Sequence, residues 1–153
     1  MQDFKYDSRV DTLFHIRQVS ALISEFTAEM LKRAIVHDKS KLESPELELF
    51  DELTPKLKDV VYGSDEYKEI LEKLKPALNH HYANNTHHPQ FFENGIDGMD
   101  LYDLCEMLLD WKAAGMRDKN GDIIKSLDIN KERFKISDQL YSILLNHAKR
   151  YLQ

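Results

Sequence analysis

The chain has 153 residues, and its 27 acidic and 21 basic side chains give a formal net charge of −6 at pH 7. This length predicts a single domain with a core of its own, and the acidic balance argues against bulk electrostatic binding to nucleic acid. Cys105 is the only cysteine, which excludes an intrachain disulfide, and the sequence has neither a signal-peptide segment nor an apolar run of the ~20 residues that span a membrane. We therefore expect a cytoplasmic protein without a membrane partner.

Apolar residues recur mainly at intervals of three and four, which is typical of α-helices. Residues 9–36 are predicted to be helical, either as one helix or as two helices separated near Thr27. A short helix is expected to have Ser44 as its N-cap and Pro45 as its first residue, and to reach about Leu53, because proline is favoured at the first position of a helix.

The middle of the chain contains two further predicted helices with a loop between them. One helix begins after Ser64 and carries an apolar stripe that ends at His81. Residues 84–98 contain helix breakers and show no sustained period, so we expect a structured loop there. A second helix is predicted for about residues 100–115.

A polar turn is predicted around residues 119–122, and Ser137 is expected to cap a final helix that ends near Tyr151. The sequence shows no internal repeat and no linker. We therefore predict an all-α protein in which residues 1–153 form a single helical domain of about five to seven helices.

His15 is the first residue that suggests chemistry. It lies within an apolar stripe of the first predicted helix, together with Val19 and Leu22, so we expect its side chain to face the core. A buried imidazole needs partners for both nitrogens. Two interpretations follow: a core histidine bonded to a backbone carbonyl, or a metal ligand.

His37 and Asp38 are adjacent at the end of an apolar helical segment. Neighbouring side chains on a regular helix point about 100° apart, so this pair can converge on one ion only where the helix ends or distorts. Their position meets that requirement. Lys41 then places a cation three residues beyond Asp38, where it could contact a phosphate oxygen.

Four of the seven histidines, His80, His81, His87 and His88, fall within nine residues. His81 continues the apolar stripe of its helix and should point inward. His87 and His88 follow polar helix breakers and could fold back over the same place. The alternative is a surface patch of histidines, or histidines that cap loop carbonyls.

Three carboxylates, Asp103, Glu106 and Asp110, share one face of the helix predicted for residues 100–115. Such a stripe is often only the solvated side of an amphipathic helix. Here Met107 interrupts the stripe and little of the helix is purely polar, which suggests that it is enclosed. A buried carboxylate must be paired or must bind a metal.

Together, His15, His37, Asp38 and Asp110 form a candidate ligand set, with Asp103 as the alternative aspartate. Imidazole and carboxylate donors suit Mn, Fe, Co, Ni or Zn, bound as one or two divalent ions. The alternative is an all-α protein without a metal, in which the histidines are packed in the core.

These residues resemble the HD-domain superfamily of metal-dependent phosphohydrolases, in which a histidine, a His-Asp pair and a later helical aspartate bind metal. The segment from His37 to Lys41 resembles its His-Asp-x-x-Lys variant. Three motifs, His-Asp-x-Ser-Lys, His-His-x-x-Asn-Asn-x-His-His-Pro and Glu-Met-x-x-Asp-Trp-x-Ala, together resemble a small uncharacterised family of bacterial and phage proteins. Within the resemblance, Asp110 is favoured over Asp103, because small residues follow it.

The resemblance implies an HD-like fold and a metal-dependent phosphohydrolase that acts on a small phosphorylated molecule, most plausibly a nucleotide. Lys41, with Arg117 as a further candidate, would neutralise charge on the phosphoryl oxygens. Glu106 or a loop histidine would position the attacking water. The remaining candidates, which would supply second-metal ligands or phosphoryl contacts, are His80, His81, His87 and His88. The alternative is a non-catalytic HD-like module that binds a nucleotide or a partner protein and keeps a structural metal site.

Overall fold

The computed structural model describes residues 6–61, 64–117, 119 and 121–152. The chain divides into two compact units, residues 1–36 and residues 37–153, and each unit is described by itself. The arrangement of all helices in one domain stays a prediction.

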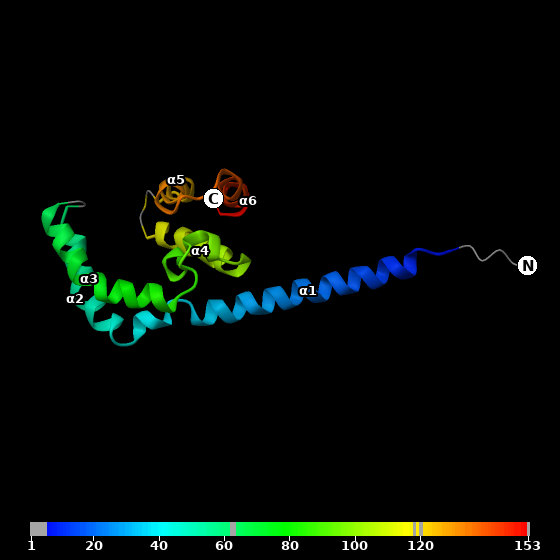
Figure 1. The fold of residues 1–153 in the computed structure, drawn as a ribbon, viewed down its shortest axis with the longest axis horizontal. Helices are drawn as coiled ribbons and strands as arrows, with labels where there is room; N and C mark the ends of the chain where they lie inside the picture. Colours follow the sequence, from blue (N-terminus) through cyan, green and yellow to red (C-terminus); the bar gives the residue numbers. More distant parts are fainter. Residues whose placement is uncertain (1–5, 62–63, 118, 120, 153) are drawn as a thin grey trace, which may run out of the picture. The chain divides into compact units, whose positions relative to one another are not determined.

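The all-α prediction is confirmed for the described residues, which form six α-helices and three short 3-10 helices and contain no strand. The elements in chain order are α1 (Arg9–Val36), η1 (Lys39–Leu42), α2 (Glu46–Asp59), α3 (Asp65–Asn84), η2 (Pro89–Phe91), η3 (Gly95–Gly98), α4 (Leu101–Gly115), α5 (Ile123–Phe134) and α6 (Asp138–Tyr151) (Figure 1). None of the helices among these residues combines the length and apolarity needed to cross a membrane.

The first unit contains one uninterrupted helix, α1. The Thr27 hydroxyl donates to the carbonyl of Ile23 at 2.9 Å, so this side chain bonds to the preceding turn and does not cap a second helix. No residue of α1 is buried, and Leu22 in the stripe around His15 is 64% exposed. The expected core-facing position of His15 is therefore not seen within this unit, because a lone helix offers no surface against which to pack.

Helix α2 differs from its prediction at both ends. Ser44 does not cap it, because the backbone N–H groups of Glu46 and Leu47 both donate to the carbonyl of Glu43, at 3.0 Å each. The helix continues past Leu53 to Asp59, since apolar residues beyond Leu53 still pack against α3. Pro55 lies inside α2, and because proline has no backbone N–H, the helix lacks one backbone hydrogen bond there.

The other predicted helix starts are confirmed. The Ser64 hydroxyl accepts from the N–H of Tyr67 at 3.1 Å, and the Ser137 hydroxyl accepts from the N–H of Leu140 at 3.3 Å. The loop expected before α4 is also present, with η2 and η3 inside it.

Helix α5 has no counterpart among the predicted helices. It begins directly after Asp122, whose carboxylate accepts from the N–H of Ile124 at 2.8 Å. The polar turn predicted around residues 119–122 falls partly outside the described residues. Asp122, the last residue of that predicted turn, is the N-cap of α5, a role that the sequence did not predict.

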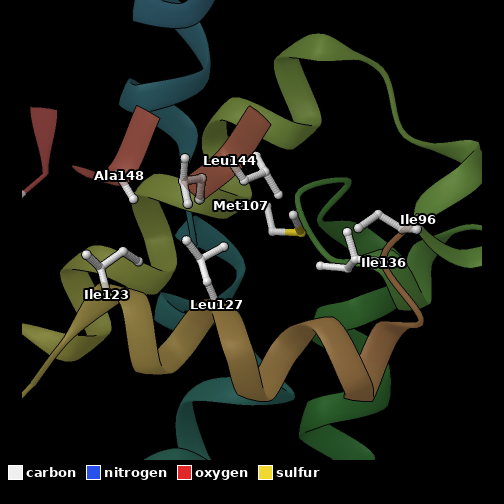
Figure 2. Packing of buried hydrophobic residues seen from close by; sticks show 8 residues of the cluster. Ile96, Met107, Ile123, Leu127, Ile136, Leu144 and Ala148 are labelled. Atoms are coloured by element: carbon white, nitrogen blue, oxygen red, sulfur yellow. The ribbon is translucent and has the colours of Figure 1, made fainter. Parts of the chain in front are cut away.

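Two apolar clusters stabilise the second unit. Leu53 of α2 packs with Ile70, Leu74 and Ala77 of α3. The larger cluster joins α4, α5 and α6 and consists of Ile96, Met107, Leu108, Ile123, Leu127, Ile136, Leu144 and Ala148 (Figure 2). Each cluster fixes one helix of the site described next: α3, which carries His80 and His81, or α4, which carries Glu106 and Asp110.

Candidate metal centre

The backbone brings His37 and Asp38 together at the end of α1. The helix ends at Val36, and Asp38 adopts a left-handed conformation with φ 56°, which aspartate tolerates better than most residues. In this conformation His37 Nε2 lies 3.7 Å from Asp38 Oδ2. The prediction that these neighbours converge where the helix ends is confirmed.

The end of α3 and the following loop bring three more histidines to Asp38. His81 is 1% exposed and His87 is 2% exposed, which confirms that His81 points inward. Asn85 fixes the loop, because its amide donates to Ser40 Oγ at 2.9 Å and to the carbonyl of His81 at 2.8 Å. His87 and His88 are thereby folded back over the end of α3, as the sequence predicts.

Asp38, His81, His87 and His88 form one group of potential metal ligands. Asp38 Oδ1 lies 3.2 Å from His81 Nε2 and 3.4 Å from His87 Nε2, and the Nε2 atoms of His81 and His88 are 2.8 Å apart. Ligand atoms that are each about 2.1 Å from one ion lie about 3.0 to 3.4 Å from one another. The two separations from Asp38 Oδ1 fall in this range, whereas the 2.8 Å contact between His81 and His88 is that of a hydrogen bond. All four ligand atoms lie within 4.8 Å of one another, close enough for a cation to hold them together.

The orientation of the imidazole rings supports this interpretation. His81 Nδ1 lies 2.9 Å from Glu46 Oε2, and His37 Nδ1 lies 2.7 Å from Glu106 Oε1. An ionised carboxylate can only accept, so each Nδ1 carries a proton, and the Nε2 of a neutral ring then has a free lone pair. In the neutral rings that a metal requires, both of these lone pairs would face Asp38, an arrangement typical of metal-binding histidines.

Two atoms in the same place lack hydrogen-bond partners. Among the described residues, Asp38 Oδ1 and His87 Nε2 are buried side-chain atoms that make no hydrogen bond. They approach each other to 3.4 Å without the geometry of a bond. Unsatisfied polar atoms are costly in the interior of a protein, and a cation between them would satisfy both.

His37, Asp38 and Asp110 form a neighbouring group. His37 Nε2 lies 3.7 Å from Asp110 Oδ1 and 3.7 Å from Asp38 Oδ2. The two oxygens of Asp38 therefore face different sets of donors. The alternative aspartate, Asp103, forms the capping box with Asp100 at the start of α4, so the structure favours Asp110 as the ligand.

The charges in this site strongly influence one another. Asp110 and Glu106 raise the pKa of His37 to about 10. Burial opposes ionisation of Asp38, but its contacts with His81, His87 and Lys41 outweigh burial and hold the pKa of Asp38 well below its usual range. Burial, together with the neighbouring His87 and His81, lowers the pKa of His88 to about 3. Asp38 is thus ionised at pH 7, and without a metal the neighbouring His37 carries a positive charge.

His15 is the predicted ligand that the structure excludes from this centre. It lies on the continuous helix α1, 21 residues before Val36, which separates the two by about 30 Å along the helix axis. His37 follows Val36 directly, so His15 cannot share an ion with His37 of the same chain. Of the two arrangements predicted for residues 9–36, only two helices separated near Thr27 could return His15 toward His37, and the unbroken helix removes that possibility.

Two other predicted residues make contacts that the sequence did not predict. His80, predicted as a ligand, is absent from the ligand groups of the described residues, and its Nδ1 contacts Glu46 Oε1 at 2.7 Å. Glu106, predicted to position water, instead approaches two imidazoles with the same oxygen: His37 Nδ1 at 2.7 Å and His87 Nδ1 at 3.2 Å. His37, His87 and Glu106 form a third group of close potential ligand atoms, and the hydrogen bond between His37 and Glu106 explains their proximity.

Lys41 lies where the sequence places it, beside the centre. Its ammonium is 2.6 Å from Asp38 Oδ2, and its side chain is 37% exposed. His81 and His88, predicted as contacts of a phosphoryl group, belong to the ligand group around Asp38 Oδ1. Arg117 is exposed in the segment that follows α4.

Sequence reasoning missed Glu46, Ser40 and Asn85. Glu46 is completely buried, and its carboxylate accepts from His81 and from Ser40 Oγ, the latter at 3.2 Å. Its position next to Pro45 indicated only a residue of the first helical turn. The only signal for Glu46 was indirect. Metal-binding imidazoles are commonly oriented by carboxylates, so the concentration of histidines indicated that some carboxylate of the chain lies beside them.

Comparisons with curated proteins and with solved structures find no match to this chain. One family model matches residues 4–150, which is nearly the whole sequence. The chain therefore belongs to that family, described as a family of unknown function (DUF5662).

Proposed function

We propose that the protein is a metal-dependent phosphohydrolase that acts on a small phosphorylated molecule, most plausibly a nucleotide. The observation that carries the proposal is the arrangement around Asp38: its buried Oδ1 faces three imidazoles, and its Oδ2 faces His37 and Lys41. The resemblance of the His-Asp and His-His motifs to the HD-domain superfamily supports the same function.

The residues fit a divalent transition ion. Asp38, His81, His87 and His88 would hold one ion, and His37, Asp38 and Asp110 would hold a second. Imidazole and carboxylate donors of this kind favour Mn, Fe, Co, Ni or Zn. A bound ion of this class polarises phosphoryl oxygens and lowers the pKa of bound water to near 7.

The residues of the chain supply binding and orientation. Lys41 provides a cation at the edge of the centre, where it can pair with a phosphoryl oxygen in place of Asp38. Glu106 keeps the rings of His37 and His87 turned with Nδ1 toward itself. With its lowered pKa, His88 is neutral at pH 7, so it serves as a donor of a lone pair and not as a general acid.

Hydrolysis is tested with protein purified without added metal and then loaded with Mn, Co, Ni, Zn or Mg. The substrates are nucleoside mono-, di- and triphosphates, cyclic nucleotides, and nitrophenyl mono- and diesters. We expect turnover with at least one transition ion and at least one of these esters. Asp38→Asn should abolish it, whereas Asp97→Asn on the exposed surface should not.

The contrary result is tight binding of an ion or a nucleotide without release of phosphate under any of these conditions. That result would refute the hydrolase and favour a binding module with a structural metal. Failure of the wild-type chain to bind any of the ions would refute the metal centre itself.

A further inference from the structure

Glu46 is a carboxylate completely removed from solvent, with three side-chain donors around it. His80 Nδ1 lies 2.7 Å from Oε1, His81 Nδ1 lies 2.9 Å from Oε2, and Ser40 Oγ lies 3.2 Å from Oε2. Burying an ionised group is costly unless donors of this kind surround it. The placement of Glu46 is therefore specific and calls for a function that an exposed glutamate could not perform.

Glu46 lies between two consecutive imidazoles. His80 and His81 are neighbours on α3, and the carboxylate offers one oxygen to each ring. A carboxylate accepts but does not donate, so it selects the form of each neutral ring that carries its proton on Nδ1. For His81, this selection leaves Nε2 as the lone-pair nitrogen, and that atom is 3.2 Å from Asp38 Oδ1.

His80 has a different environment from His81. Its side chain is 39% exposed, whereas that of His81 is 2% exposed. It belongs to none of the ligand groups found among the described residues, and its closest charged partner there is Glu46. His80 thus contacts Glu46 on the side that faces solvent, whereas the buried His81 contacts both Glu46 and Asp38.

We propose that Glu46 is a positioning residue for the ligand His81, and that His80 in turn holds Glu46 in place. This inference rests on the metal centre of the proposed function. A carboxylate behind a ligating imidazole fixes the ring and increases its basicity, and loss of such a carboxylate typically weakens metal binding 10- to 100-fold.

Glu46 also begins α2, where any negative charge favours the helix N-terminus. A purely structural role would therefore be shared with Glu48, which lies in the same first turn and is exposed. Glu48→Gln removes the same charge from the same helix end without touching a histidine. It is the matched control for Glu46→Gln.

The experiment uses the full chain in four forms: wild type, Glu46→Gln, Glu48→Gln and His80→Asn. Circular dichroism reports folding, titration calorimetry gives the affinity for Zn and Mn, and long-range ¹H–¹⁵N correlation spectra identify the protonated nitrogen of His81 in metal-free protein. We expect a proton on Nδ1 of His81 in the wild type. Affinity should fall 10- to 100-fold in Glu46→Gln, several-fold in His80→Asn, and less than twofold in Glu48→Gln.

A folded Glu46→Gln variant that binds both ions as tightly as the wild type would overturn the inference. So would a wild-type His81 that carries its proton on Nε2. If Glu46→Gln does not fold, His80→Asn decides, because its site is partly exposed, and unchanged affinity in that variant also overturns the inference.

The outcomes that test the proposed function can be distinguished from those that test the role of Glu46. A wild type that binds no ion refutes the metal centre, but the spectra of the metal-free protein still decide the role of Glu46. A wild type that binds ions and hydrolyses nothing refutes only the hydrolase.

Discussion

Removal of metal should make the stability of the second unit strongly dependent on pH, through His37. Its pKa is raised to about 10 by Asp110 and Glu106, against 6.5 in an unfolded chain. A folded-state pKa above the unfolded value stabilises the fold fully below pH 6.5, and this contribution is lost as the pH rises toward 10. Metal-free protein should therefore lose stability between pH 6.5 and 9.

The expected size follows from the two pKa values. Proton linkage for a single group with these values amounts to about 3 kcal/mol between pH 6.5 and 9. The His37 side chain is 29% exposed, so partial solvent screening reduces the expected loss to about 2 kcal/mol. The pKa of His87 is also raised, since Asp38 and Glu106 outweigh its burial, and its titration acts in the same direction.

The assay is urea unfolding in the presence of a chelator, followed by the fluorescence of Trp111. This residue is the only tryptophan and stacks on Phe134 at a centroid distance of 6.0 Å, so it reports on the core that carries α4. The control is His37→Gln, in which the fall from pH 6.5 to 9 should shrink by about 2 kcal/mol. Equal pH dependence in wild type and variant would refute the reasoning.

Three further predictions concern single substitutions. Asp38→Asn should keep the fold, because asparagine tolerates a positive φ, but it should lose bound metal in elemental analysis; a full metal content would contradict the ligand assignment. Lys41→Met should retain metal and lower turnover by about 10²-fold in steady-state kinetics, since it removes one cation at the phosphoryl position; unchanged turnover would exclude that role. Leu127→Ala, at a side chain with 0% exposure, should cost about 2 to 5 kcal/mol in urea unfolding while leaving metal affinity of the folded protein unchanged.

Much of the fold follows from local signals in the sequence. Ser64 and Ser137 cap the helices that they were expected to begin, because a capping side chain acts on backbone groups within three residues. Ser44 does not cap α2, because the backbone N–H groups of Glu46 and Leu47 already donate to the carbonyl of Glu43. Helix α5 was missed because the polar residues before it indicated only a turn, although Asp122 among them is its cap.

The candidate site is predictable where helix phase or a helix end determines the direction of a side chain. His81 points inward because it continues an apolar stripe, and His37 and Asp38 converge because α1 ends between Val36 and His37. The partnership of Glu46 with His80 and His81 spans more than thirty residues and two helices, so no local period reveals it. His15 was misassigned because helical phase gives the direction of its side chain but does not show whether residues 9–36 form one helix or two, and one continuous helix keeps it far from His37.

The central claim is that Asp38, His81, His87 and His88 share a cation. Anomalous scattering from crystals of protein purified without added metal, recorded at the Mn, Fe, Co, Ni and Zn edges, tests it most directly. The account predicts an anomalous peak within bonding distance of Asp38 Oδ1 and of the three imidazoles. Crystals that show no such peak, even after soaking with these ions, and in which Asp38 Oδ1 accepts a hydrogen bond from a protonated His87 or His81, would contradict it.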